Sequence, residues 1–174
     1  MKKNIMREAF EALDGKLPTP VTMLIGGGAA MLLAHDIPLI TMDVDGLPLT
    51  SQLSPSELDP LIKEVAKELG ISPHWYNDYF NTFTHTLPKD FRDRLKNVFL
   101  GKKLTVAALG LDDLLIMKCF AGREKDIGHA RALIRKGANV DAVEAHIETL
   151  IGKGLPDAGR AKDFLTTIID QLGE

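Results

Sequence analysis

The fold is decided by two short stretches of the chain, LIGGGAA at residues 24–30 and TMDVD at residues 41–45. The apolar run 21–25 before the glycines predicts a buried strand, and the small apolar residues 29–35 after them favour a helix packed on a sheet. Residues 40–44 read as a second strand, which we expect Gly46 and Pro48 to end. The sequence therefore predicts a strand, a glycine turn, a short helix and a second strand in succession.

Asp43 and Asp45 are the residues of this segment whose side chains could bind a metal ion. Residues i and i+2 of a strand point to the same face, so the two carboxylates should lie close enough to hold Mg²⁺. Carboxylates this close repel each other unless a cation lies between them. The preceding glycines allow a backbone to approach a phosphate, and the following helix start offers N–H groups to it. Alone, each part has an alternative interpretation, a tight turn or a solvated strand end; together they indicate a site.

Composition places the chain among ordinary globular proteins. Its 174 residues, 45% apolar and 26% charged, fit one domain with a substantial core. No apolar run approaches the roughly 20 residues that cross a bilayer, so we expect no membrane partner. Cys119 is the only cysteine, which excludes an intrachain disulfide and predicts a cytoplasmic protein.

Charge is unevenly distributed although the net charge is only −3. No Lys or Arg occurs between Lys16 and Lys63, whereas residues 118–136 are rich in both. An acidic and a basic segment in one small domain are suited to a cation and a phosphate side by side. The alternative is two ordinary solvated surfaces.

The rest of the chain alternates helices, turns and one further strand. Ser54, Pro55 and Glu57 form a helix start, and that helix should end at Gly70. We also expect helices at 2–13, 111–136, 140–152 and 157–172, a strand at 104–109, and an irregular, aromatic-rich segment at 72–90. The predicted class is α/β (α+β), with one domain over 1–174, a sheet-bearing core at about 15–110 and a helical portion at 111–174.

These motifs resemble the signature of the nucleotidyltransferase superfamily, the DNA polymerase β-like fold. Within it the chain is most similar to small proteins of the DUF6036 type, related to the AbiEii toxin group. Two further segments support the resemblance: WYND at residues 75–78, and LLIMKCFAGREKD at residues 114–126, which resembles a Lys-x4-Arg-x-Lys-Asp helix. The resemblance spans about residues 20–136.

This resemblance implies Mg²⁺-dependent transfer of a nucleoside monophosphate from an NTP to an acceptor. Gly26 and Gly27 would cradle the triphosphate, Asp43 and Asp45 would hold the metal, and Lys118 would contact the phosphates. Asp43, Asp45 and Lys118 are thus the implied catalytic residues. The acceptor would be RNA, a protein or a small molecule, and the chain would be the toxin of a toxin–antitoxin pair, with an antitoxin as partner. The alternative is a degenerate member that binds nucleotide or a partner protein without turnover.

A helical projection of residues 111–136 adds Lys125 as a second nucleotide contact. Lys118, Lys125 and His129 fall within about 40° of one another on a polar face. Arg123 projects to the apolar side three residues before Asp126, which predicts a structural pair.

The chain also departs from the superfamily pattern. Sites of this type use a third carboxylate from a later strand, but the strand at 104–109 has no acid. Asp78 is the substitute candidate for a third metal ligand; its alternative role is in a turn or a helix cap. Trp75 and its aromatic neighbours either stack a base or pack in the core.

Overall fold

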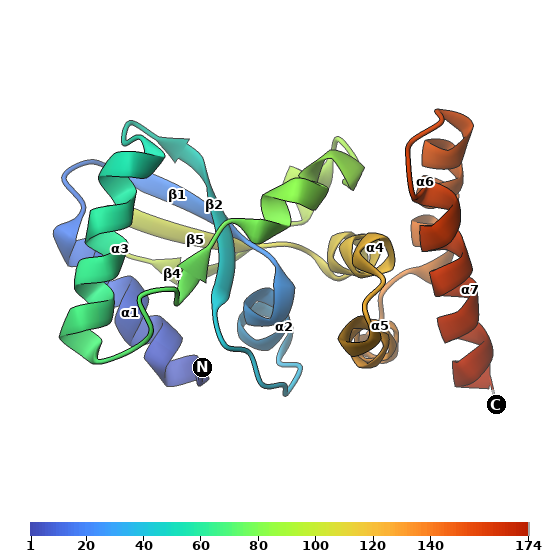
Figure 1. Cartoon of the computed structure of the whole chain (residues 1–174), viewed down its shortest axis with the longest axis horizontal. Coiled ribbons are helices and arrows are strands. Elements are labelled where there is room, and N and C mark those ends of the chain that lie inside the picture. Colours follow the sequence, from blue (N-terminus) through green and yellow to red (C-terminus); the bar gives the residue numbers. More distant parts are fainter. Residues whose placement is uncertain (174) are drawn as a thin grey trace. The chain divides into compact units, whose positions relative to one another are not determined.

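The computed structural model describes residues 1–173, which form two compact units. The sheet-bearing unit contains residues 1–81 and 95–109, and the helical unit contains residues 82–94 and the described residues from 110 to 173. The predicted α/β (α+β) class is confirmed, since helices and a mixed sheet make up the chain (Figure 1). Residues 82–94, which the sequence assigned to the sheet-bearing core, belong to the helical unit. One domain over 1–174 stays a prediction.

A mixed sheet forms the centre of the first unit. Its strands are β1 (Val21–Ile25), β2 (Val44–Ser51), β3 (Tyr76–Asn77), β4 (Lys96–Leu100) and β5 (Leu104–Ala108), in the order β3-β2-β1-β5-β4. β1 is parallel to β5 and antiparallel to β2, β2 is parallel to β3, and β4 is antiparallel to β5. The two central strands, β1 and β5, are buried over almost their whole length, as their continuous apolar sequences predict.

Three helices complete this unit: α1 (Lys3–Lys16), α2 (Gly27–His35) and α3 (Pro55–Leu69). α1 packs against α3 beside the sheet (Figure 1), and the Phe10 ring of α1 lies 6.4 Å from the Trp75 ring and 5.8 Å from the Phe99 ring. Trp75 is completely buried, and its Nε1 donates to the Ile62 carbonyl oxygen at 2.9 Å. Trp75 is therefore a core residue, the second of the two roles considered for it.

Two strand predictions need correction. The strand expected at 40–44 begins only at Val44 and continues through Gly46 and Pro48. Proline is tolerated there because β3 pairs only with Val44 and Asp45, so the rest of β2 is an edge where a missing N–H costs little. β4 was not predicted, because its half-buried and exposed side chains on an edge strand lack an apolar pattern.

The second unit is built from the 3₁₀-helix η2 (Phe91–Arg94), part of η1 (Tyr79–Thr86), and the helices α4 (Leu111–Ala121), α5 (Glu124–Lys136), α6 (Val140–Gly152) and α7 (Ala158–Gly173). The single helix expected at 111–136 is wrong. Gly122 adopts the left-handed conformation at φ 58° and ends α4, and Arg123 then caps α5. Over residues 1–173, no helix is both long and apolar enough to cross a membrane.

Asp14, near the end of α1, holds the turn between β4 and β5. Its carboxylate accepts the backbone N–H groups of Lys102, Lys103 and Leu104 at 3.1, 2.7 and 2.7 Å. Partial burial raises the pKa of Asp14, but these N–H donors outweigh it and hold the pKa below its usual value. Asp14 thereby ties the first helix to the sheet.

We expect Asp14→Ala to lower the free energy of unfolding by about 1–3 kcal/mol, the usual contribution of hydrogen bonds to a charged group. Because folding lowers this pKa, the contribution is complete above the unfolded pKa of about 3.9 and is lost as pH falls through the folded pKa. Denaturant unfolding from pH 7 to pH 3 measures it, with exposed Glu11→Ala of the same helix as control. A difference between wild type and Asp14→Ala that does not shrink in acid would contradict the assignment.

Candidate functional site

The glycine turn lies directly against Asp45. The β1–β2 register pairs Ile25 with Gly46, and the Gly26 N–H donates to the Asp45 carbonyl oxygen at 2.9 Å. Gly27 has φ +56°, and a Cβ at this position would lie 2.2 Å from Asp45 Oδ2. Only a residue without a side chain allows this carboxylate to lie so close to the turn.

The start of α2 adds backbone donors to the same place. Gly26 is the N-cap and Gly27 the first residue of the helix, whose first turn contains no acidic side chain. The first N–H groups of a helix lack intrahelical partners and form the positive end of its dipole. The geometry thus places the backbone N–H groups at the start of a helix beside the carboxylate of Asp45.

Asp43, Asp45 and Asn77 share one face at the start of β2. The parallel β2–β3 register pairs Asp45 with Asn77, and the Asn77 Nδ2 donates to Asp43 Oδ2 at 2.6 Å. Val44 between the two aspartates is completely buried, whereas both aspartates are half-buried. Since alternate residues of a strand point to opposite faces, the Asp45 carboxylate lies on the side away from Val44. The contact with Asn77, the strand partner of Asp45, brings the Asp43 carboxylate to the same side. Asp43 itself precedes the strand, and Thr41 Oγ1 donates to its carbonyl oxygen at 2.9 Å.

Sequence reasoning did not identify Asn77 as a site residue. It occurs in the WYND segment at 75–78, which was noted only for its resemblance. Its contact with Asp43 depends on the pairing of β3 with β2, and a two-residue strand leaves no periodic signal in a sequence.

Asp78 does not join the two aspartates in a larger group. It is exposed, and its carbonyl oxygen accepts the Asn81 N–H at 2.9 Å, as in a turn. Among the residues described, no three His, Cys, Asp or Glu side chains form a group that could hold a metal ion. This face therefore presents two carboxylates, those of Asp43 and Asp45, and the Asn77 amide lies beside the first of them.

The predicted phosphate contact Lys118 lies on α4 in the helical unit, where it is buried. Its Nζ contacts Asp126 Oδ1 at 2.9 Å, and Arg123 Nε donates to Asp126 Oδ2 at 2.8 Å. The predicted pair of Arg123 with Asp126 is confirmed. Burial raises the pKa of the fully buried Asp126, but Arg123 and Lys118 outweigh this effect and hold the pKa below its usual value.

The predicted polar face of Lys118, Lys125 and His129 needs correction, because the break at Gly122 places Lys118 on one helix and the other two on the next. Lys125 is exposed. His129 Nδ1 lies 3.9 Å from Asp126 Oδ1, and burial, followed by the charge of Lys118, lowers the pKa of this imidazole. Lys118, Arg123 and His129 are thus arranged around Asp126 rather than along one helix face.

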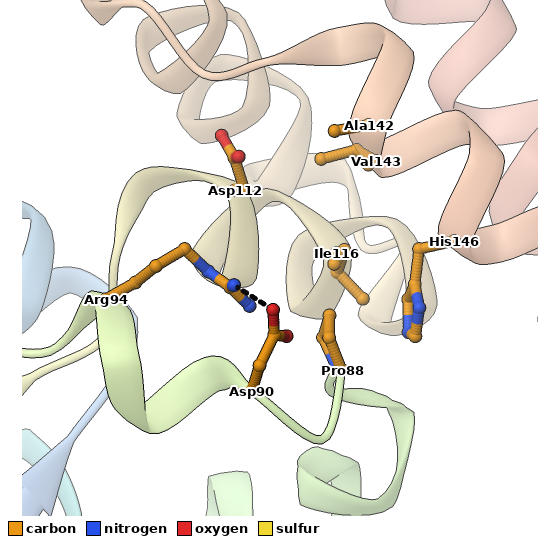
Figure 2. Close-up of a pocket in the computed structure, with 8 residues that line it drawn as sticks. All are labelled: Pro88, Asp90, Arg94, Asp112, Ile116, Ala142, Val143 and His146. Atoms are coloured by element: carbon orange, nitrogen blue, oxygen red, sulfur yellow. Dashed lines mark ion pairs between the residues drawn. The ribbon is translucent and has the colours of Figure 1, made fainter.

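The helical unit also contains a cavity of about 230 Å³ (Figure 2). It is lined by Pro88, Asp90, Arg94, Asp112, Ile116, Ala142, Val143 and His146. Its polar groups are engaged within the protein: Arg94 pairs with Asp90 at 3.1 Å, and His146 Nε2 donates to the Thr86 carbonyl oxygen at 2.7 Å. Arg94 also makes a bidentate contact with buried Asp113. None of the residues predicted for the site lines this cavity.

We expect Gly27→Ala to destabilise the protein by at least about 1–3 kcal/mol, because a side chain in the left-handed region is strained and its Cβ would displace the Asp45 carboxylate. Gly15→Ala is the matched control in the same unit: a Cβ there meets nothing within 4 Å inside α1, and helix propensity predicts a gain of up to about 1 kcal/mol. Thermal unfolding of the three proteins measures both effects. Equal stability of wild type and Gly27→Ala would rule out the close approach.

Comparison with known proteins places the chain in a family. A family model described as "Nucleotidyltransferase of unknown function (DUF6036)" matches residues 3–166, and the chain therefore belongs to this family. Comparisons with curated proteins and with solved structures found no match. The match confirms the resemblance to nucleotidyltransferases at this general level; the likeness to AbiEii toxins and to DNA polymerase β stays a prediction.

Proposed function

We propose that this member of a nucleotidyltransferase family transfers a nucleoside monophosphate from an NTP to an acceptor, at a site formed by Gly26, Gly27, Asp43 and Asp45. The single observation that supports it best is the contact between the turn and the carboxylate at Gly27 and Asp45. In the proposed reaction an acceptor hydroxyl attacks the α-phosphorus and releases its proton to the solvent. The bond from that phosphorus to the oxygen that bridges the α- and β-phosphates breaks, and pyrophosphate leaves.

The residues present fit Mg²⁺. This ion prefers oxygen ligands and is usually bound by one or two carboxylates together with substrate phosphates. Asp43 and Asp45 offer these oxygens on one half-buried face, and the missing Cβ at Gly27 lets the Asp45 carboxylate lie against the glycine turn. When bound, the ion would neutralise phosphate charge and polarise the phosphorus–oxygen bonds.

The backbone of the turn would orient the triphosphate. Gly26 and Gly27 allow phosphate oxygens to approach the chain closely, and the N–H groups of the first turn of α2 would donate to them. Such donors are preorganised by the helix, so they need no rearrangement as charge develops on the phosphates.

Lys118 remains a proposed nucleotide contact on the basis of the family resemblance. Lys125 also stays a proposal, although the projection that predicted it treated residues 111–136 as one helix. Lys118 Nζ contacts Asp126, and this pair neutralises a buried carboxylate. The proposal therefore rests on the four residues of the sheet-bearing unit and not on the two lysines.

A second candidate function is binding of nucleotide, or of a partner protein, without turnover. It is favoured by the donor set, in which an amide rather than a third carboxylate lies beside Asp43. The family resemblance also implies an RNA, protein or small-molecule acceptor, and a role as a toxin with an antitoxin partner. We retain both as proposals.

Transfer from α-labelled NTPs tests the proposal. With Mg²⁺ and each of the four NTPs, we expect label to enter one of three acceptors offered in parallel: tRNA, a cell protein fraction or an aminoglycoside. Asp43→Asn and Asp45→Asn should each lower this transfer by about 100-fold or more, in line with the loss of a group that stabilises transition-state charge.

The control variant is Asp59→Asn, an exposed aspartate of α3 that pairs with Lys63, and it should transfer as wild type does. Nucleotide binding without transfer to any acceptor would favour the second candidate. If wild type binds no nucleotide, or if Asp43→Asn and Asp45→Asn bind nucleotide as wild type does, both transfer and nucleotide binding at this site are contradicted.

A further inference from the structure

We propose that Asn77 is a positioning residue that holds the Asp43 carboxylate in the orientation that binds a divalent cation. This inference rests on the proposed function, because it concerns the same pair of carboxylates. Asn77 itself would not touch the cation; it would act through Asp43.

The orientation of the Asn77 amide is fixed by its two neighbours. The backbone N–H of Tyr79 donates to Asn77 Oδ1 at 3.0 Å, so the oxygen end of the amide faces that N–H. The Nδ2 end therefore faces Asp43, where it donates to Oδ2 at 2.6 Å. This short contact between an amide donor and an ionised carboxylate is of the stronger, charge-assisted kind.

Asp43 requires such a partner more than Asp45 does. Asp45 lies within β2, and its carboxylate is confined by the Gly27 backbone. Asp43 precedes the strand, and the contact from Thr41 Oγ1 fixes its carbonyl oxygen rather than its side chain. The hydrogen bond from Asn77 engages Oδ2 and leaves the other oxygen of Asp43 for a cation. Partners of this kind orient metal-binding carboxylates, and their loss typically costs 10–100-fold in affinity.

The competing explanation is that Asn77 only shapes the chain at the start of η1. An Asn whose side-chain oxygen accepts the N–H two residues on forms a local turn, and serine can form the same turn. A serine hydroxyl at position 77 would therefore keep the contact with the Tyr79 N–H, but it is too short to reach Asp43. The Asn77→Ser variant therefore distinguishes a role in positioning Asp43 from a role in the local turn.

The test is a titration of the full chain with Mn²⁺ in the absence of nucleotide, with binding monitored by electron paramagnetic resonance. We expect Asn77→Ala and Asn77→Ser each to weaken Mn²⁺ binding by about 10-fold, while Asn77→Ser unfolds at a temperature closer to wild type than Asn77→Ala does. Asn97→Ala, an exposed asparagine of β4 in the same unit, should bind Mn²⁺ as wild type does.

Wild-type affinity in Asn77→Ser would overturn the positioning role, because the contact with Asp43 would then be dispensable. Asp43→Asn separates this failure from that of the proposed function. If Asp43→Asn loses Mn²⁺ and the Asn77 variants do not, only the role of Asn77 is wrong. If Asp43→Asn binds Mn²⁺ as wild type does, the metal centre is absent and both proposals fall.

Discussion

The structure of the candidate site depends on one constraint, the register between β1 and β2. This register places the end of one strand beside the beginning of the other, so that the Gly26 N–H reaches the Asp45 carbonyl oxygen. A shift by one residue would turn the aspartates to the opposite face and put Val44 where they now lie. Gly27 completes the arrangement, because a side chain at that position would occupy the place of the Asp45 carboxylate. The glycine turn and the carboxylate proposed to bind phosphate and cation thus come from one strand pair.

In the helical unit, by contrast, the buried carboxylates are paired with basic side chains. Asp113 pairs with Arg94, and Asp126 pairs with Lys118 and Arg123. A buried carboxylate left without its partner is strongly destabilising, so these pairs are first of all requirements of the fold. Lys118 is therefore explained as a structural cation by its contacts here, whereas its role toward phosphate is an expectation from the family.

The sequence predicted the parts of the fold in which a local pattern and the tertiary structure agree. The central strands were found from continuous apolar runs, and the helix start at Ser54 from its capping box, which the structure contains. The misses have physical causes: Pro48 is tolerated because its strand is an edge, and Gly122 ends a helix that looks continuous in its apolar pattern. The aspartates and glycines of the site stand out in the sequence, but Asn77 acts through pairing between strands distant in sequence, which no single segment reveals.

The proposed reaction requires that Asp43 and Asp45 hold one divalent cation beside the glycine turn. Anomalous X-ray diffraction from crystals of the chain grown with Mn²⁺ and a non-hydrolysable NTP analogue tests it most directly. We expect a manganese peak about 2.1 Å from a carboxylate oxygen of each aspartate, with the analogue's phosphates next to Gly26 and Gly27. Saturating Mn²⁺ with no peak at these oxygens, or carboxylates turned away from each other, would contradict it.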